Sequence, residues 1–143
     1  MILYLDTSAF LKLYVKEPES AHVRQAIKEA VALCTHVLTY AEARAGFARA
    51  VRMGRLTPRR LTTLKRDLER DWQRVDVLGV DEALVRRAGD LAERFALRGY
   101  DSVHLAAAEA AMLRLGGSVD FRFLACDATL ATAAASLGLA SGI

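Results

Sequence analysis

Short apolar segments alternate with helical segments along the whole sequence. The apolar segments lie at residues 2–5, 31–37, 75–78 and 121–126, and a shorter one covers residues 139–143. Consecutive strands that are separated by helices run parallel, because each crossover returns the chain to the same end of the sheet. The alternation therefore predicts an α/β fold with three α/β/α layers, in which helices cover both faces of a parallel sheet of four to five strands.

Helical periodicity and terminating residues predict the helices between these strands. We expect them at residues 8–15, 20–30, 39–53, 58–72, 81–97, 101–115 and 127–137. The third and fourth form a protruding hairpin, and its segment RAVRMGRLTPRRLTTLKRDLERDWQR at residues 49–74 is rich in arginine. Trp72 completes a narrow leucine stripe at helical spacing, so we interpret it as a packing residue.

Composition limits the class of protein. With 143 residues, 53% of them hydrophobic, the chain is expected to form a single domain over residues 1–143. No apolar run approaches the roughly 20 residues that span a bilayer, and the first run is too short for a secretory signal, so we expect a cytoplasmic protein without a membrane partner. Cys34 and Cys126 lie far apart in apolar segments and are expected to be buried thiols.

Four acidic residues stand at junctions between these elements. Asp6, Glu42 and Asp127 each follow a strand, so a parallel sheet carries them to the edge where such folds bind ligands. Asp101 follows a helix, and the topology does not place it. Asp120 precedes a strand and is expected at the opposite edge. Anions that share a crevice repel one another unless a cation lies between them, and Mg²⁺ is a suitable one.

Each of these acids also has a purely structural interpretation. Aspartate is among the best N-cap residues, and the helix dipole favours a carboxylate in the first turn. Thr39-Tyr40-Ala41-Glu42 matches the capping box. For any one acid taken alone, capping remains the alternative to chemistry.

Four short motifs carry a resemblance to a known family. LDTSA at residues 5–9, TYAEA at 39–43, YDSVHLAAA at 100–108 and LACDATL at 124–130 occur in this order. They resemble the four acidic motifs of PIN-domain nucleases, and the chain is most similar to the VapC toxins of type II toxin–antitoxin pairs. The resemblance reaches from residue 5 to the final helix and implies a PIN-like fold.

The resemblance also implies a site and an activity. It assigns the catalytic and metal-binding roles to Asp6, Glu42, Asp101 and Asp127, and it alone places Asp101 in the site. Asp6, Glu42 and Asp101 would hold Mg²⁺ or Mn²⁺, and Asp127 would hold a second ion or orient the attacking water. The implied activity is that of a metal-dependent endoribonuclease acting as a toxin, with no other cofactor.

The partners follow from the same resemblance. It implies an RNA substrate, a homodimer and a VapB-like antitoxin, whose tail covers the acidic site with an arginine or lysine. It implies no sequence-specific DNA binding by this chain itself. The basic segment 49–74 would line a groove leading to the acids, although a solvated helical face explains the same charges equally well. The net charge of +3 permits a nucleic-acid partner without indicating one.

Polar residues close to the motif acids receive smaller roles. Thr7 and Ser8 would supply hydroxyl or amide groups beside Asp6, or simply start a helix. His104 lies three residues after Asp101, on nearly the same helix face, and we interpret it as a packed side chain beside the site rather than a general base. His22 and His36 have no partner at metal-ligand spacing and receive no role.

Three other classes of protein share parts of this pattern. Haloacid dehalogenase-like phosphatases need a second aspartate two residues after the first, where this chain has Ser8. Receiver domains need a late lysine, and residues 67–143 contain none. A catalytically inactive PIN-fold module that binds RNA or a protein is the remaining alternative, but all four acidic positions are filled.

Overall fold

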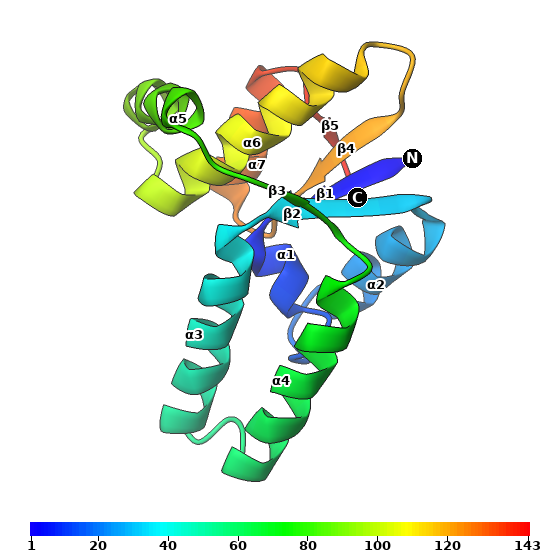
Figure 1. Cartoon of the computed structure of the whole chain (residues 1–143), viewed down its shortest axis with the longest axis vertical. Helices are drawn as coiled ribbons and strands as arrows, with labels where there is room; N and C mark the ends of the chain where they lie inside the picture. The colour runs from blue at the N-terminus through cyan, green and yellow to red at the C-terminus, as the bar shows by residue number, and fades with distance from the viewer.

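The computed structural model describes residues 1–143 and contains one sheet of five strands (Figure 1). All neighbouring strands pair in parallel, in the order β3-β2-β1-β4-β5. The strands are β1 (Ile2–Leu5), β2 (Ala32–His36), β3 (Asp76–Leu78), β4 (Phe121–Leu124) and β5 (Ala140–Ser141). Their carboxyl ends open on a single edge, as the alternating pattern predicted.

Seven helices complete the three layers. They are α1 (Thr7–Leu11), α2 (Ser20–Glu29), α3 (Leu38–Arg52), α4 (Pro58–Trp72), α5 (Glu82–Phe95), α6 (Gly99–Leu115) and α7 (Ala128–Ser136). One buried cluster draws its residues from α5, α6 and α7, and the other draws them from α1 to α4. The predicted α/β/α architecture is confirmed, and Figure 1 shows the hairpin of α3 and α4 extending away from the sheet.

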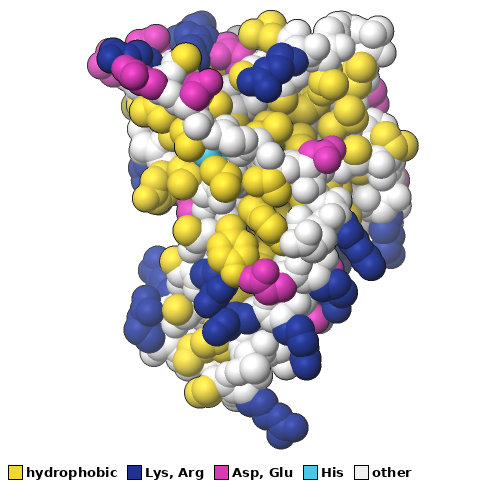
Figure 2. Space-filling model, in the orientation of Figure 1, with side chains coloured by type: hydrophobic (Ala, Val, Ile, Leu, Met, Phe, Trp, Pro, Cys, Tyr) yellow, Lys and Arg dark blue, Asp and Glu magenta, His cyan; other side chains and the backbone are white.

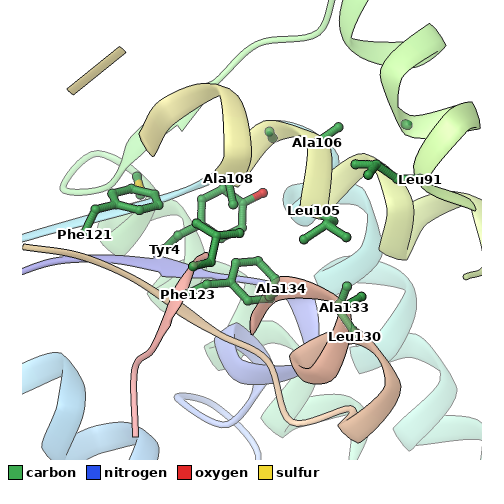
Figure 3. Packing of buried hydrophobic residues seen from close by; sticks show 14 residues of the cluster. Tyr4, Leu91, Leu105, Ala106, Ala108, Phe121, Phe123, Leu130, Ala133 and Ala134 are labelled. Atoms are coloured by element: carbon green, nitrogen blue, oxygen red, sulfur yellow. The ribbon is translucent and has the colours of Figure 1, made fainter. Parts of the chain in front are cut away.

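The two cores follow from the alternation of side chains along β1. Tyr4 points to one face, where its ring stacks on Phe123 at a centroid distance of 5.4 Å beneath α6 and α7 (Figure 3). Leu3 and Leu5 point to the other face and pack with α1 and the helical hairpin. All three side chains are fully buried, so β1 is fixed from both sides.

The helix starts lie within one residue of the predicted ones except at α6, and α1 ends at Leu11 rather than at residue 15. α3 begins at Leu38 rather than Thr39, and the expected capping box does not form. The Thr39 hydroxyl bonds instead to the Thr35 hydroxyl at 2.7 Å, in a buried network that β2 supplies. α6 begins at Gly99, so Asp101 lies within its first turn instead of opening it.

The smaller expectations about packing are confirmed. Trp72 packs edge-on against Phe10 and Tyr40, which makes it a core residue of the hairpin. Cys34 is a buried free thiol, and Cys126 is a partly buried one. None of the helices is both long enough and apolar enough to cross a lipid bilayer.

Candidate active site

Asp6 is a buried carboxylate at the end of β1. It is 3% exposed, and its Oδ1 accepts hydrogen bonds from the Ala9 amide and the Ser8 hydroxyl, both at 2.8 Å. Burial raises the pKa of Asp6 to about 6, although the bonds from Ala9 and Ser8 act in the opposite direction. No lysine or arginine pairs with it. Asp6 therefore has no paired lysine or arginine in the folded chain, and a bound cation would supply the missing positive charge.

Ser8 ties this acid to the neighbouring strand. Its hydroxyl accepts a hydrogen bond of 2.9 Å from the Cys126 amide, which follows β4, while it donates to Asp6. The Asp6 amide in turn donates to the Leu124 carbonyl at 3.1 Å. The ends of β1 and β4 are therefore joined through the site.

Glu42 is oriented by a buried chain of hydrogen bonds. The Thr7 hydroxyl donates to Glu42 Oε1 at 2.7 Å, and His104 Nε2 lies 2.9 Å from the same oxygen. Because a carboxylate only accepts, Nε2 carries the proton, and Nδ1 accepts from the Tyr4 hydroxyl at 2.9 Å. Partial burial raises the pKa of Glu42, but the bonds from His104 and Thr7 outweigh it and leave the pKa below its ordinary value.

Asp101 lies in the first turn of α6 and faces Glu42 across a pocket. The pocket has a volume of about 370 Å³ and is lined by Glu42, Arg98, Gly99, Tyr100 and Asp101. Arg98 Nε donates to Asp101 Oδ2 at 3.1 Å. The topology did not place Asp101 here, and the motif resemblance did. The basic segment 49–74 does not line this pocket.

Asp127 approaches the pocket from β4. Its Oδ1 caps α7 by accepting from the Leu130 amide at 2.8 Å. The pKa of Arg98 is raised mainly by the hydrogen bond to Asp101, with further contributions from the charges of Asp127 and Glu42. Asp101 is the one motif acid to which Arg98 bonds directly.

The capping and chemical interpretations of the acids are compatible. Asp6 and Asp127 do cap helices, each with one oxygen. Asp120, by contrast, lies beyond the opposite end of β4, paired with Arg122, as its place before the strand predicted. Capping therefore explains where two of the acids sit but does not use all of their oxygens.

The donor set suits a hard divalent cation. Glu42, Asp101 and Asp127 each keep one carboxylate oxygen that receives no hydrogen bond from the protein. In this conformation, however, no three acidic, histidine or cysteine side chains come close enough together to share one ion. Arg98 pairs with Asp101 Oδ2 and leaves Oδ1 free, so the acids would have to move closer together for several of them to hold one ion.

The structure shows the surroundings of each of the three histidines. His104 is 2% exposed and supports Glu42, which confirms the packed interpretation. His36, which received no role, is buried with its ring 6.1 Å from that of His104. His22 is exposed on α2. Arg98 was also missed, and the only local signal for it was its position three residues before Asp101.

Comparison with known sequences gives a consistent result. The PIN domain family matches residues 3–128. The chain is 37% identical over 107 residues to "Ribonuclease VapC45" of Mycobacterium tuberculosis (strain CDC 1551 / Oshkosh), covering 75% of this chain and 74% of that protein. It is 31% identical over 138 residues to "Ribonuclease VapC46" of M. tuberculosis (strain ATCC 25618 / H37Rv), covering 96% and 94%.

Solved structures share the fold at lower identity. FitAcB from Neisseria gonorrhoeae aligns with a TM-score of 0.67 at 20% identity, covering 99% of this chain and 96% of that one. A toxin–antitoxin complex from Klebsiella pneumoniae aligns with a TM-score of 0.61 at 13% identity, covering 87% and 86%. At these identities the likeness concerns the fold alone.

Proposed function

This chain belongs to the PIN domain family, and we propose that it is a metal-dependent endoribonuclease that acts as the toxin of a toxin–antitoxin pair. Its relatives named as VapC ribonucleases, at 31% to 37% identity, support this reading. The observation that carries the proposal is the meeting of Glu42 and Asp101 in one pocket, with Asp6 and Asp127 at the same edge of the sheet.

The four motif acids would hold the metal. Asp6, Glu42 and Asp101 are its proposed ligands, and Asp127 would bind a second ion or orient the attacking water. A bound Mg²⁺ or Mn²⁺ supplies Lewis acidity toward the phosphodiester and its water nucleophile. His104 and Thr7 orient the Glu42 carboxylate through their hydrogen bonds to its Oε1.

RNA binding is assigned to the basic surface. Figure 2 shows Lys and Arg side chains along the part of the molecule that α3 and α4 form. Those that are exposed and form no ion pair are Arg49, Arg52, Arg59, Arg60, Lys65, Arg66 and Arg74. Phosphate contacts of this kind provide affinity that does not depend on sequence.

Two protein partners complete the proposal. An antitoxin would place a basic side chain into the acidic pocket, where it would replace Arg98 as the partner of the acids. A second copy of the chain would cover the groove of about 540 Å³ between α5 and α6, which is lined by exposed Val80 and Leu113. Such a toxin would act in the cytoplasm as a single domain of 143 residues.

The direct test is cleavage of labelled RNA by the purified chain, with Mg²⁺ or Mn²⁺ and with EDTA. We expect cleavage that EDTA abolishes and that Asp6→Asn removes. Asp120→Asn is the matched control, because Asp120 lies at the opposite end of the sheet, and it should cleave like the wild type. RNA binding without cleavage would instead support the inactive binding module.

A second test uses growth. Expression of the wild-type chain without an antitoxin should arrest growth, and Asp101→Ala should relieve the arrest. If the Asp101→Ala chain is equally toxic at equal expression, Asp101 has no catalytic role.

A further inference from the structure

Arg98 is unusual among the arginines of this chain, because its partner is one of the motif acids. The side chain is 83% exposed, and Asp101 is its hydrogen-bonded partner. An exposed pair at spacing i,i+3 contributes little to the stability of a helix. Stability therefore does not explain an arginine at this position.

Tyr100 lies in the wall of the same pocket and is unusual among the tyrosines. Its side chain is 60% exposed, forms no hydrogen bond and packs against no other ring. Tyr4, Tyr14 and Tyr40, in contrast, each make a hydrogen bond and at least one ring contact. The phenol ring of Tyr100 is thus free to stack on a ligand, and it lines the same pocket as Glu42 and Asp101.

The pocket consequently combines two opposite chemistries. Glu42 and Asp101 offer oxygens for a cation, while Arg98 and Tyr100 offer a guanidinium fork and a ring. A guanidinium binds a phosphate with two parallel hydrogen bonds, and an aromatic ring stacks on a base of any sequence. Both groups match a single-stranded polynucleotide whose phosphate lies at the acids.

We propose that Arg98 and Tyr100 form the RNA-contacting wall of this pocket, in which Arg98 binds a backbone phosphate and Tyr100 stacks on an adjacent base. This inference rests on the proposed ribonuclease function. On RNA binding the guanidinium would leave Asp101 Oδ2 for the phosphate, and both Asp101 oxygens would then be available to hold a metal ion. Arg98 therefore keeps Asp101 paired until substrate and ion replace it.

The experiment measures RNA binding and metal binding separately. Binding of a fluorescent single-stranded RNA is followed by anisotropy in the Asp6→Asn background with Mg²⁺, so that no cleavage interferes. Arg98→Ala should weaken binding by about 5- to 10-fold and lower the slope of log Kd against log salt by about one. Tyr100→Ala should weaken it by about 5-fold or more, whereas Tyr100→Phe, which keeps the ring, should bind normally.

Mn²⁺ binding to the otherwise wild-type chain, followed by electron paramagnetic resonance, gives the second readout. Arg98→Ala should bind Mn²⁺ more tightly, by about 3-fold or more, because Asp101 loses its competing cation. A merely structural arginine would not produce opposite changes in RNA and metal affinity.

Arg86→Ala is the matched control. Arg86 forms the same kind of exposed pair, with Glu82 one helix turn away on α5. If Arg86→Ala weakens RNA binding as much as Arg98→Ala, net charge alone explains the loss and the inference is wrong. If the wild type cleaves RNA but Arg98→Ala and Tyr100→Ala bind it normally, the inference fails while the ribonuclease function stands. If the wild type neither binds nor cleaves RNA, both proposals fail.

Discussion

The two ends of α1 carry charged clusters of opposite design. At its C-terminal end the buried Lys12 ammonium lies 3.3 Å from Glu17, which also accepts from Arg55 at 3.1 Å. One acid there has two cations from the same chain. At the N-terminal end Asp6 pairs with no lysine or arginine, and of the nearby pocket acids only Asp101 does, with the exposed Arg98.

The charges of Lys12, Glu17 and Arg55 stabilise the fold, whereas the charge of Asp6 is available to a ligand. Glu17 pairs with both Lys12 and Arg55, so removing Glu17 leaves the buried Lys12 charge uncompensated. Asp6 has no paired lysine or arginine in the folded chain, so its burial carries a cost that the proposed metal ion would offset. Substitutions in the two clusters should therefore have opposite effects on stability and on RNA cleavage.

Asp6→Asn should give the largest effect and the sharpest contrast. RNA cleavage should fall by at least about 100-fold, since a proposed metal ligand is lost. The midpoint of thermal unfolding should stay the same or rise, because the amide oxygen still caps the Ala9 amide and the buried charge is gone. A fall of several degrees would show that the carboxylate stabilises the fold, which would break the comparison.

His104→Phe should have the next largest effect. An aromatic ring is kept, but Glu42 loses the hydrogen bond that orients it. Mn²⁺ affinity should fall by about 10-fold, as for other residues that orient metal ligands. Tyr4→Phe removes only the bond on the far side of the imidazole and should change the affinity by less than about 3-fold. Equal losses in the two variants would mean that the network acts through packing instead.

Glu17→Ala tests the other cluster. Lys12 loses its anion, and the free energy of unfolding measured in urea should fall by about 1 to 2 kcal/mol. RNA cleavage should not change. Glu82→Ala, which breaks an exposed pair on α5, should cost less than about 0.5 kcal/mol. A cleavage defect in Glu17→Ala without unfolding would show that the two clusters are coupled.

The smallest expected effect is a dependence on pH. Partial burial raises the pKa of Glu17, but hydrogen bonds from Arg55 and Lys12 outweigh it and hold the pKa below its ordinary 4.5. The stability that ionised Glu17 contributes is therefore present above pH 4.5 and is lost as the pH falls through the lower folded value. The cost of Glu17→Ala should shrink over that acid range by less than about 1 kcal/mol. A cost that grows on acidification would contradict the assignment.

Sequence patterns predicted the parts of the site that topology controls. Asp6 and Asp127 each follow a strand, so a parallel sheet had to bring them to one edge. Asp101 follows a helix, and only motif resemblance placed it. Arg98 was not predicted, because its spacing of three from Asp101 is a weak local signal and its place in the pocket with Glu42 depends on tertiary packing.

Local motifs failed where tertiary contacts compete with them. Thr39 and Glu42 match a capping box, but the fold offers each side chain a buried partner instead. Thr39 bonds to Thr35, and Glu42 bonds to Thr7 and His104. A pattern four residues long cannot register the partners of Glu42, which lie 35 and 62 residues away in the sequence.

The Ser8 hydroxyl, which receives the Cys126 amide and donates to Asp6, has a consequence for biosynthesis. The first strand leaves the ribosome early, but the group that steadies its acid is anchored only after β4 has been translated and inserted beside β1. We therefore expect a nascent toxin to remain harmless until β4 has folded beside β1. A truncated chain that ends before Phe121 should leave RNA intact, and cleavage by that fragment would refute this built-in delay.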